Sequence, residues 1–510
     1  MINCYRWAIL HFRGLLWYNN SVMKKIAFVL LGGIFTLTTF AADENPAADY
    51  VVISPKNYVK LWTWYIGERA KAHPEIKFAV KSAADIYNEY PYDAANTDGS
   101  PRNAAESIHA YIGVQKGKGT KYFILGGNWF DAQYDATSRN SFPPRRFNDN
   151  SSPTLDNAIP GIVTYPRVNK DGIFVTMSAN PSDLYFACHY IPEGAKYAWD
   201  PNGDGVYCGL KETNPDNMCD YRHFQPEVVV ARMDFTPGYW QEDGEFLNYS
   251  QLVTNYVAKL ARGEAKDFAG NDKYAVWISY CEGYDEKGDP DVTGVMHERG
   301  KAIEQYRKAA EVEYYTYTKA VEGDEAEAKR MIADVVAKNW DVFLPFGHGT
   351  PDGFAGFDTY DFKDSTVIMK FFMANVPCFT GSTTSETSGA QVALSNPNGG
   401  SLVSVNNTSY GWASPSGIKE RYLGVSDELV DWCLDAYVKD GETAGEAWRK
   451  AIATYSPRVL TPETTAEEID KRDYTGDENC VYAAIVEEML FGDPLIKLSP
   501  LHIAPRIIVK

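Results

Sequence analysis

Two stretches decide the expected fold: DVFLPFGHGT at residues 341–350 and KFFMANVPCFTG at residues 370–381. Each contains an apolar run that ends at a reactive residue, His348 in the first stretch and Cys378 in the second. Short apolar runs bounded by glycine and proline are typical of buried strands in a parallel sheet. Because such strands present their carboxyl ends at one edge, where α/β proteins bind ligands, we expect His348 and Cys378 to share that edge.

A thiol and an imidazole at one edge favour nucleophilic chemistry. The imidazole can take the proton of the thiol and stabilise the thiolate. Gly349 has no side chain to block a substrate carbonyl, so its N–H can contribute to an oxyanion hole. The alternative is that both residues are ordinary packed residues at strand ends.

The rest of the chain alternates between predicted strands and amphipathic helices, which indicates an α/β fold with parallel strands. Predicted strands lie at residues 50–55, 76–80, 121–128, 225–235, 274–283, 313–321 and 401–412, and predicted helices at 61–73, 105–117, 252–264, 296–311, 324–339, 426–441 and 443–456. Residues 130–180 are rich in Asn, Ser, Asp and Pro and are interpreted as a long surface excursion. A subdomain boundary is expected near residues 262–270.

The amino terminus has the pattern of an export signal. Met23 and two lysines precede IAFVLLGGIFTLTTFA (26–41), which ends in small residues. We therefore expect residues 1–42 to be a leader with a start at Met23, and the protein to be exported to the periplasm, cell surface or surroundings of a bacterium. A membrane anchor is the alternative, although an apolar run of ~15 residues broken by Gly and Thr is short for a span.

The net charge argues against two classes of partner. The chain of 510 residues carries a formal charge of −19, and the first 42 residues hold four basic and no acidic residues, which gives −23 (−19 minus 4) without them. A strongly acidic protein is repelled by nucleic acid and by anionic membrane surfaces. We therefore expect no nucleic-acid partner and no membrane span after the leader is removed.

The eight cysteines divide by expected role. Cys4 belongs to the leader, and Cys378 stays free if it is a nucleophile. An exported protein can oxidise the remaining six, and the local group Cys188, Cys208 and Cys219 is the preferred source of a disulfide, with its connectivity open.

An Asp/Asn/Gly string resembles a calcium loop. Asp200, Asn202 and Asp204 alternate before Gly205, as in calcium-binding loops, but Lys211 stands where an EF-hand has its closing Glu. Such strings also form ordinary turns. Calcium would be structural, because the expected chemistry requires no cofactor. Three other carboxylates are candidate additional ligands: Asp183, Asp220 and Glu227.

Three further residues are candidates for the site. Glu282 ends a predicted strand, and a carboxylate bonded to the far imidazole nitrogen would fix the tautomer of His348. Its alternative is a solvated carboxylate beside Gly283. Tyr410 and Trp412 follow a strand expected near Cys378, where they would line a substrate pocket or pack at its rim.

These motifs together resemble the catalytic domain of the gingipains, caspase-like bacterial cysteine endopeptidases. The resemblance runs from about residue 48 to residue 497. The motifs occur in the family's order: KYFILGG, PSDLYFAC, WDPNGDG, PEVVVAR, ISYCEG, a His-Glu pair at 297–298, GHG at 347–349, VPCFTG at 376–381, NTSYGWASP at 407–415 and FGDPLI at 491–496. The resemblance rests on the fact that these motifs follow one another in the same order as in the family.

The resemblance implies a fold and a set of roles. The fold would be two adjoining α/β subdomains, residues 43–262 and 263–500, each with a mostly parallel sheet flanked by helices, followed by a tail at 501–510. Cys378 would be the nucleophile, His348 the general base and acid, and Glu282 the residue that orients the imidazole. The N–H groups of Gly349 and Cys378 would form the oxyanion hole.

The implied function is peptide-bond hydrolysis by an exported cysteine endopeptidase that acts on proteins or peptides through an acyl-enzyme. Arginine specificity is not implied, because residues 294–296 (Gly-Val-Met) precede the His-Glu pair where Arg-specific members carry an acidic pocket residue. Two alternatives stay open: a catalytically inactive relative that binds peptides or surface material, and a calcium-stabilised structural protein.

Overall fold

The computed structural model describes residues 48–131, 154–164, 180–191, 193–200, 203, 207, 224–235, 241–242, 245–279, 299–354, 356–362, 365–374, 376–383, 388–409, 411, 426–459 and 484–498. The predicted leader at 1–42 and the tail at 501–510 lie outside these residues.

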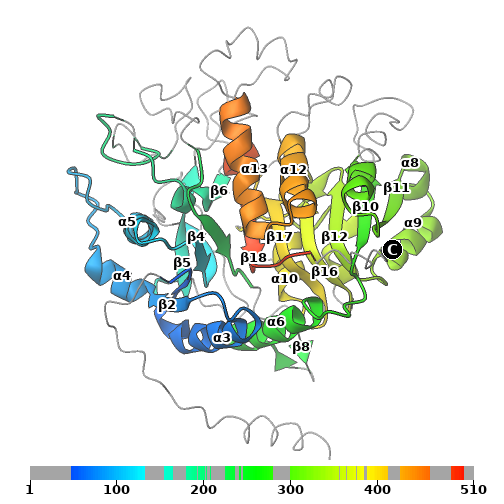
Figure 1. Cartoon of the computed structure of the whole chain (residues 1–510), viewed down its shortest axis with the longest axis horizontal. Helices are drawn as coiled ribbons and strands as arrows, with labels where there is room; N and C mark the ends of the chain where they lie inside the picture. The colour runs from blue at the N-terminus through cyan, green and yellow to red at the C-terminus, as the bar shows by residue number, and fades with distance from the viewer. Residues whose placement is uncertain are drawn as a thin grey trace, which may run out of the picture. The chain divides into compact units, whose positions relative to one another are not determined.

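Ten strands of the described residues form one sheet, in the order β11-β10-β12-β16-β17-β18-β7-β3-β1-β2 (Figure 1). The apolar runs of the sequence form its centre, because every residue of β12, β16 and β17 is buried. The bounds are β1 (Tyr50–Ser54), β2 (Phe78–Ser82), β3 (Tyr122–Leu125), β7 (Val229–Arg232), β10 (Lys273–Ser279), β11 (Glu311–Tyr317), β12 (Trp340–Phe346), β16 (Ile368–Ala374), β17 (Gly400–Asn407) and β18 (Glu488–Gly492).

The mostly parallel sheet flanked by helices confirms the predicted α/β fold. Strands from both predicted segments join this sheet, and β18, from the end of the chain, lies between β17 and β7. The division at residue 262 stays a prediction.

The sheet changes direction once. Neighbouring strands are parallel except β17 and β18, where Asn407 at the end of β17 lies opposite Glu488 at the start of β18. Strands β18, β7, β3, β1 and β2 therefore run opposite to the other five.

Helices cover both faces of the sheet. Phe371 of β16 lies opposite Val403 of β17, so the two side chains share one face of the sheet. Leu402, the neighbour of Val403 in β17, therefore points to the other face. Phe371 packs on Tyr437 with ring centroids 4.9 Å apart, whereas Leu402 packs against Gly263 of α6. Figure 1 shows α12 and α13 in front of β17 and β18. The helix bounds are η1 (Lys56–Tyr58), α3 (Val59–Ala72), α4 (Ala83–Glu89), α5 (Ala104–Gly117), η3 (Leu184–Ala187), α6 (Tyr249–Gly263), α8 (Lys319–Glu322), α9 (Glu325–Val335), η6 (Thr359–Phe362), α10 (Gly389–Ser395), α12 (Ser426–Leu434), the π-helical turn η7 (Asp435–Lys439) and α13 (Ala444–Val459).

Part of the region interpreted as a surface excursion is instead a buried strand. Strand β5 (Ala158–Thr164) pairs with β4 (Asn128–Asp131) and with β6 (Asn180–Ser182). The fully buried Arg232 donates to the carbonyl of Ile159 (2.9 Å) and pairs with Asp183 (2.6 Å). This distant guanidinium satisfies backbone carbonyls there, which a local sequence pattern cannot indicate.

A buried ionic network joins the first half of the chain to its end. Asp493 of the FGDPLI motif is fully buried and pairs with Arg69 of α3 (2.5 Å). Arg69 also pairs with Glu264 (2.5 Å), and Tyr65 donates to Asp493 (2.9 Å). The motif therefore fixes helices against the sheet rather than supplying a reactive group.

Two buried, stacked histidines should make the folded protein less stable in acid. The rings of His109 and His189 stack with centroids 4.2 Å apart. Burial lowers the pKa of His109 to about 4, although its bond to the Cys188 carbonyl acts in the opposite direction, and burial also lowers the pKa of His189. The unfolded chain therefore binds protons more readily than the folded one, and stability falls as the pH drops from about 6.5 towards 4, by on the order of 2 kcal/mol.

Urea denaturation of the parent and of the double variant His109→Gln/His189→Gln between pH 7 and pH 4.5 measures this effect. The unfolding free energy of the variant should depend less steeply on pH. Parallel curves would show that other groups cause the acid sensitivity.

Within the described residues, none of the helices combines the length and the apolar composition that a bilayer span needs.

Candidate active site

The two reactive residues follow neighbouring parallel strands. In the sheet, Phe343 of β12 lies opposite Phe372 of β16. His348 comes two residues after β12, and Cys378 comes four residues after β16. Gly347 turns the chain out of β12 with a φ of 144°, a value that residues with side chains rarely adopt. Both residues therefore leave the sheet at the same edge.

Close packing joins the two segments. A Cβ atom added to Gly349 would lie 2.6 Å from the nitrogen and 2.4 Å from the carbonyl oxygen of Cys378. Only glycine allows this approach without displacing backbone. The residue after His348 is thus in contact with the backbone of Cys378.

An aromatic cluster fixes the segment that carries His348. This segment continues into a small antiparallel sheet of β13 (Gly349–Thr350), β14 (Gly353–Phe354) and β15 (Phe357–Asp358). Phe354 and Phe357 are buried and stack on each other with centroids 5.3 Å apart. Phe357 also packs on Trp277 of β10 (4.4 Å). His348 itself is exposed, so its ring is accessible beside an immobilised loop.

The segment after β17 holds the turn that contains Cys378. We call residues 376–381 the nucleophile turn. The N–H of Phe379 donates to Ser409 (2.5 Å), and the N–H of Gly381 donates to the carbonyl of Asn407 (2.7 Å). The Asn407 side chain donates from Nδ2 to the carbonyl of Pro377 (3.3 Å).

The nucleophile turn is strained. Phe379 has a φ of 58°, in the left-handed region that bulky residues avoid. Strained residues persist only where the surroundings over-determine them, and they are concentrated at functional sites. The hydrogen bonds to Ser409 and Asn407 supply that support.

The surroundings of the Cys378 thiol raise its pKa. The half-buried Sγ lies 3.8 Å from the carbonyl oxygen of Gly411. Burial raises the pKa of the Cys378 thiol, and the Glu487 carboxylate raises it further, while backbone hydrogen bonds from Gly411 and Gly349 oppose this change. Nucleophilic attack by this sulfur therefore requires a base to remove the proton.

Comparison with known proteins identifies the family. A model described as Peptidase family C25 matches residues 43–499. The chain belongs to peptidase family C25. It is therefore a cysteine-type peptidase of the gingipain family that acts on protein substrates, which confirms the resemblance noted in the sequence.

One solved structure agrees in fold with this C25 peptidase. The Arg-specific cysteine proteinase gingipain R aligns with a TM-score of 0.51 and 14% identity, covering 89% of this chain and 79% of that one. A structure described only as a protease aligns with a TM-score of 0.49 and 11% identity, with the same coverage. No curated protein sequence matches the chain.

Several predicted site residues of the C25 peptidase lie outside the described residues. They are the orienting carboxylate and the two pocket aromatics, Glu282, Tyr410 and Trp412, and the potential calcium ligands Asn202, Asp204 and Asp220. Their roles stay predictions.

The remaining candidate calcium ligands each contact a cation of the protein. Asp200 is buried and pairs with Arg102 (2.5 Å), while its other oxygen accepts from the N–H of Gly203 (3.0 Å). Asp183 pairs with Arg232, and Glu227 pairs with Lys116. Among the described residues, no group of three or more His, Cys, Asp or Glu side chains is arranged to hold a metal ion.

Two other cysteines of the C25 peptidase are free thiols. Cys188 and Cys433 are buried and unbridged. A disulfide from Cys188 to Cys208 or Cys219 is therefore not formed in this structure. Burial raises the pKa of both buried thiols, so they are poor nucleophiles.

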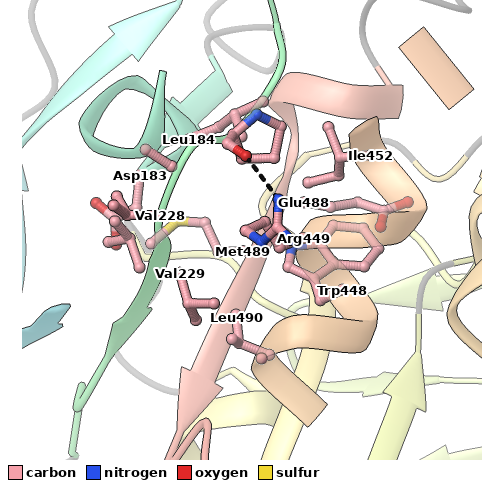
Figure 2. Close-up of a pocket in the computed structure, with 14 residues that line it drawn as sticks. Asp183, Leu184, Val228, Val229, Trp448, Arg449, Ile452, Glu488, Met489 and Leu490 are labelled. Atoms are coloured by element: carbon pink, nitrogen blue, oxygen red, sulfur yellow. Dashed lines mark hydrogen bonds between the residues drawn. The ribbon is translucent and has the colours of Figure 1, made fainter. Parts of the chain in front are cut away.

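A pocket lies beside the start of β18, which is two strands away from β16 in the sheet (Figure 2). It is bounded by η3, the starts of β7 and β18, and α13, and neither His348 nor Cys378 lines it. In Figure 2, Arg449 extends across it and donates to the carbonyl of Pro226 (3.3 Å). This pocket is separate from the candidate site.

The sequence did not reveal the supporting residues. Asn407 and Ser409 belong to the NTSYGWASP motif, but nothing in their spacing pairs them with a turn about 30 positions earlier. The strained φ of Phe379 is equally invisible in sequence. The signal that could have indicated them was the position of the motif directly after the strand next to β16.

Proposed function

We propose that this peptidase hydrolyses peptide bonds through Cys378 and His348, with a thioester acyl-enzyme as intermediate. The observation that carries the proposal is the packing of Gly349 against the backbone of Cys378. It supports a common site because His348 is joined directly to Gly349. The raised pKa of the Cys378 thiol supports a role for a base at the moment of attack.

The chemistry proceeds in two halves. The Sγ of Cys378 attacks the scissile carbonyl carbon while His348 takes the thiol proton, and the N–H groups of Gly349 and Cys378 stabilise the oxyanion. When the C–N bond breaks, the imidazolium donates its proton to the leaving amine. Water, deprotonated by His348, then attacks the thioester and releases Cys378 as a thiol.

Other predicted features complete this proposal. Glu282 orients the imidazole, Tyr410 and Trp412 line the substrate pocket, and calcium at Asp200, Asn202 and Asp204 is structural. Residues 1–42 direct export from a bacterial cell and are removed from the mature protein. The acidic surface and this export are consistent with polypeptide substrates outside the cytoplasm and not with nucleic acid.

Alkylation of the native protein by iodoacetamide, followed by peptide mapping, tests the reactive pair. Cys378 should be modified much faster than Cys188 and Cys433, which serve as internal buried controls. The alkylation rate of Cys378 should fall at least about tenfold in His348→Ala, because the imidazole promotes the thiolate. An unreactive Cys378, or one indifferent to His348, would instead favour a peptide-binding relative without cleavage.

A further inference from the structure

The side chain of Asn407 contacts the peptide bond that precedes Cys378. Its Nδ2 donates to the carbonyl oxygen of Pro377, and the backbone carbonyl of Asn407 accepts from the N–H of Gly381 at the far end of the nucleophile turn. Asn407 is fully buried as the last residue of β17. One residue of the neighbouring strand therefore spans the whole turn.

We propose that Asn407 is a positioning residue that sets the direction of the Cys378 N–H in the oxyanion hole. The inference rests on the proposed function, because it assigns a role to an N–H group only if Cys378 attacks a carbonyl.

Because a peptide is planar, the direction of the Pro377 carbonyl determines the direction of the Cys378 N–H. The Pro377–Cys378 bond is trans, so its C=O and N–H groups point in opposite directions within one plane. A hydrogen bond that holds the Pro377 oxygen towards Asn407 therefore holds the Cys378 N–H away from it. Gly349, the second proposed donor, packs against this same peptide. Holding the Pro377 carbonyl thus also fixes the Cys378 N–H relative to the N–H of Gly349.

The turn needs such a restraint because it is strained. Phe379, with its φ of 58°, directly follows Cys378. Relaxation of that φ acts first on the Cys378–Phe379 peptide plane, whereas the Cys378 N–H belongs to the Pro377–Cys378 plane before it, so this second plane needs a restraint of its own. The N–H of Phe379 is held by Ser409, but Asn407 supplies the side-chain bond to the plane before Cys378.

Asn406 provides a matched control. It is the same residue type on the same strand and is also fully buried. Neither polar atom of its side chain has a hydrogen-bond partner among the described residues. Replacing Asn406 changes a buried amide of β17 without removing a bond to the Pro377–Cys378 peptide.

The test compares two reactions of the same thiol. Hydrolysis of a fluorogenic peptide, selected by the parent from a mixed pool, passes through an oxyanion, whereas alkylation by iodoacetamide does not. In Asn407→Asp, which keeps the shape but removes the donor, kcat should fall by about 30-fold or more while KM stays within about threefold. The alkylation rate of Cys378 should stay within about threefold of the parent.

A second variant and the control guard against misfolding. Asn407→Ala should likewise lower kcat while leaving the alkylation rate of Cys378 close to that of the parent. If the circular dichroism spectrum of either variant differs from that of the parent, Asn407→Ser is used in its place. Asn406→Asp should keep kcat within about threefold, since it leaves the oxyanion donors in place.

Three outcomes overturn the inference. An Asn407 variant with parental kcat removes the positioning role. Equal losses of kcat and alkylation indicate a general structural role for Asn407. If Cys378→Ala retains parental hydrolysis, the proposed function is wrong, and this inference is wrong with it. If Cys378→Ala is inactive while Asn407→Asp keeps parental activity, only this inference is wrong.

Discussion

Cys378→Ala should lose peptide hydrolysis, with kcat/KM at least about 10⁴-fold below that of the parent. The substitution removes the atom that forms the thioester and leaves only binding and the oxyanion donors. His348→Ala should lose a comparable factor, because a thiol whose pKa is raised by burial needs a base. Hydrolysis of a fluorogenic peptide selected from a mixed pool measures both variants.

The double variant should be scarcely less active than either single one, since residues that act as a unit have non-additive effects. Cys188→Ala is the matched control, because it removes a buried thiol that pairs with no other cysteine and lies outside the site. Its kcat/KM should stay within about threefold of the parent, as expected for a substitution away from the chemistry. Parental activity in Cys378→Ala would falsify the assignment of the nucleophile.

Asp493→Ala should destabilise the fold by roughly 3–5 kcal/mol. Asp493 and Arg69 are almost fully buried and paired at 2.5 Å, and Asp493 also accepts from Tyr65 and from the N–H of Leu495 (2.9 Å each). The substitution leaves the positive charge of Arg69 buried with Glu264 as its remaining carboxylate partner. It also removes the hydrogen bonds that hold α3 and the end of β18 in place. Urea denaturation followed by tryptophan fluorescence measures the change.

An exposed ion pair is the control for this experiment. Lys329 and Glu325 pair on the surface of α9, with side chains 73% and 81% exposed. Lys329→Ala should change the unfolding free energy far less than Asp493→Ala does, because water screens such exposed pairs. If Asp493→Ala were as stable as Lys329→Ala, the buried network would not hold the two halves together.

The central strands and their reactive ends could be placed from sequence. Uninterrupted apolar runs can be satisfied only in a sheet buried on both faces, and β12 and β16 are such strands. The glycines beside His348 marked the point where the chain leaves the sheet. This reasoning uses only neighbours in the sequence, which is why it succeeded there.

The parts that were missed depend on partners distant in the sequence. Strand β5 is stabilised by Arg232, about 70 positions later, and the nucleophile turn is held by Asn407, 30 positions later. The ion pair of Asp200 with Arg102 of the loop before α5 was not foreseen either, while calcium binding at Asp200 stays a prediction. Local composition cannot indicate which distant cation or carbonyl satisfies a group.

The reversal between β17 and β18 places the starts of β7 and β18, rather than their ends, at the rim where His348 and Cys378 leave the sheet. The segment that enters β18 lies at this rim, where Thr408 donates to the carbonyl of Glu487 and to that of Pro181. The chain leaves β1 and β3 at the far rim, although the segment after β3 returns to the rim of Cys378 at Pro181. An insertion directly after β1 should therefore leave the proposed cleavage unchanged, whereas an insertion just ahead of β18 should alter it.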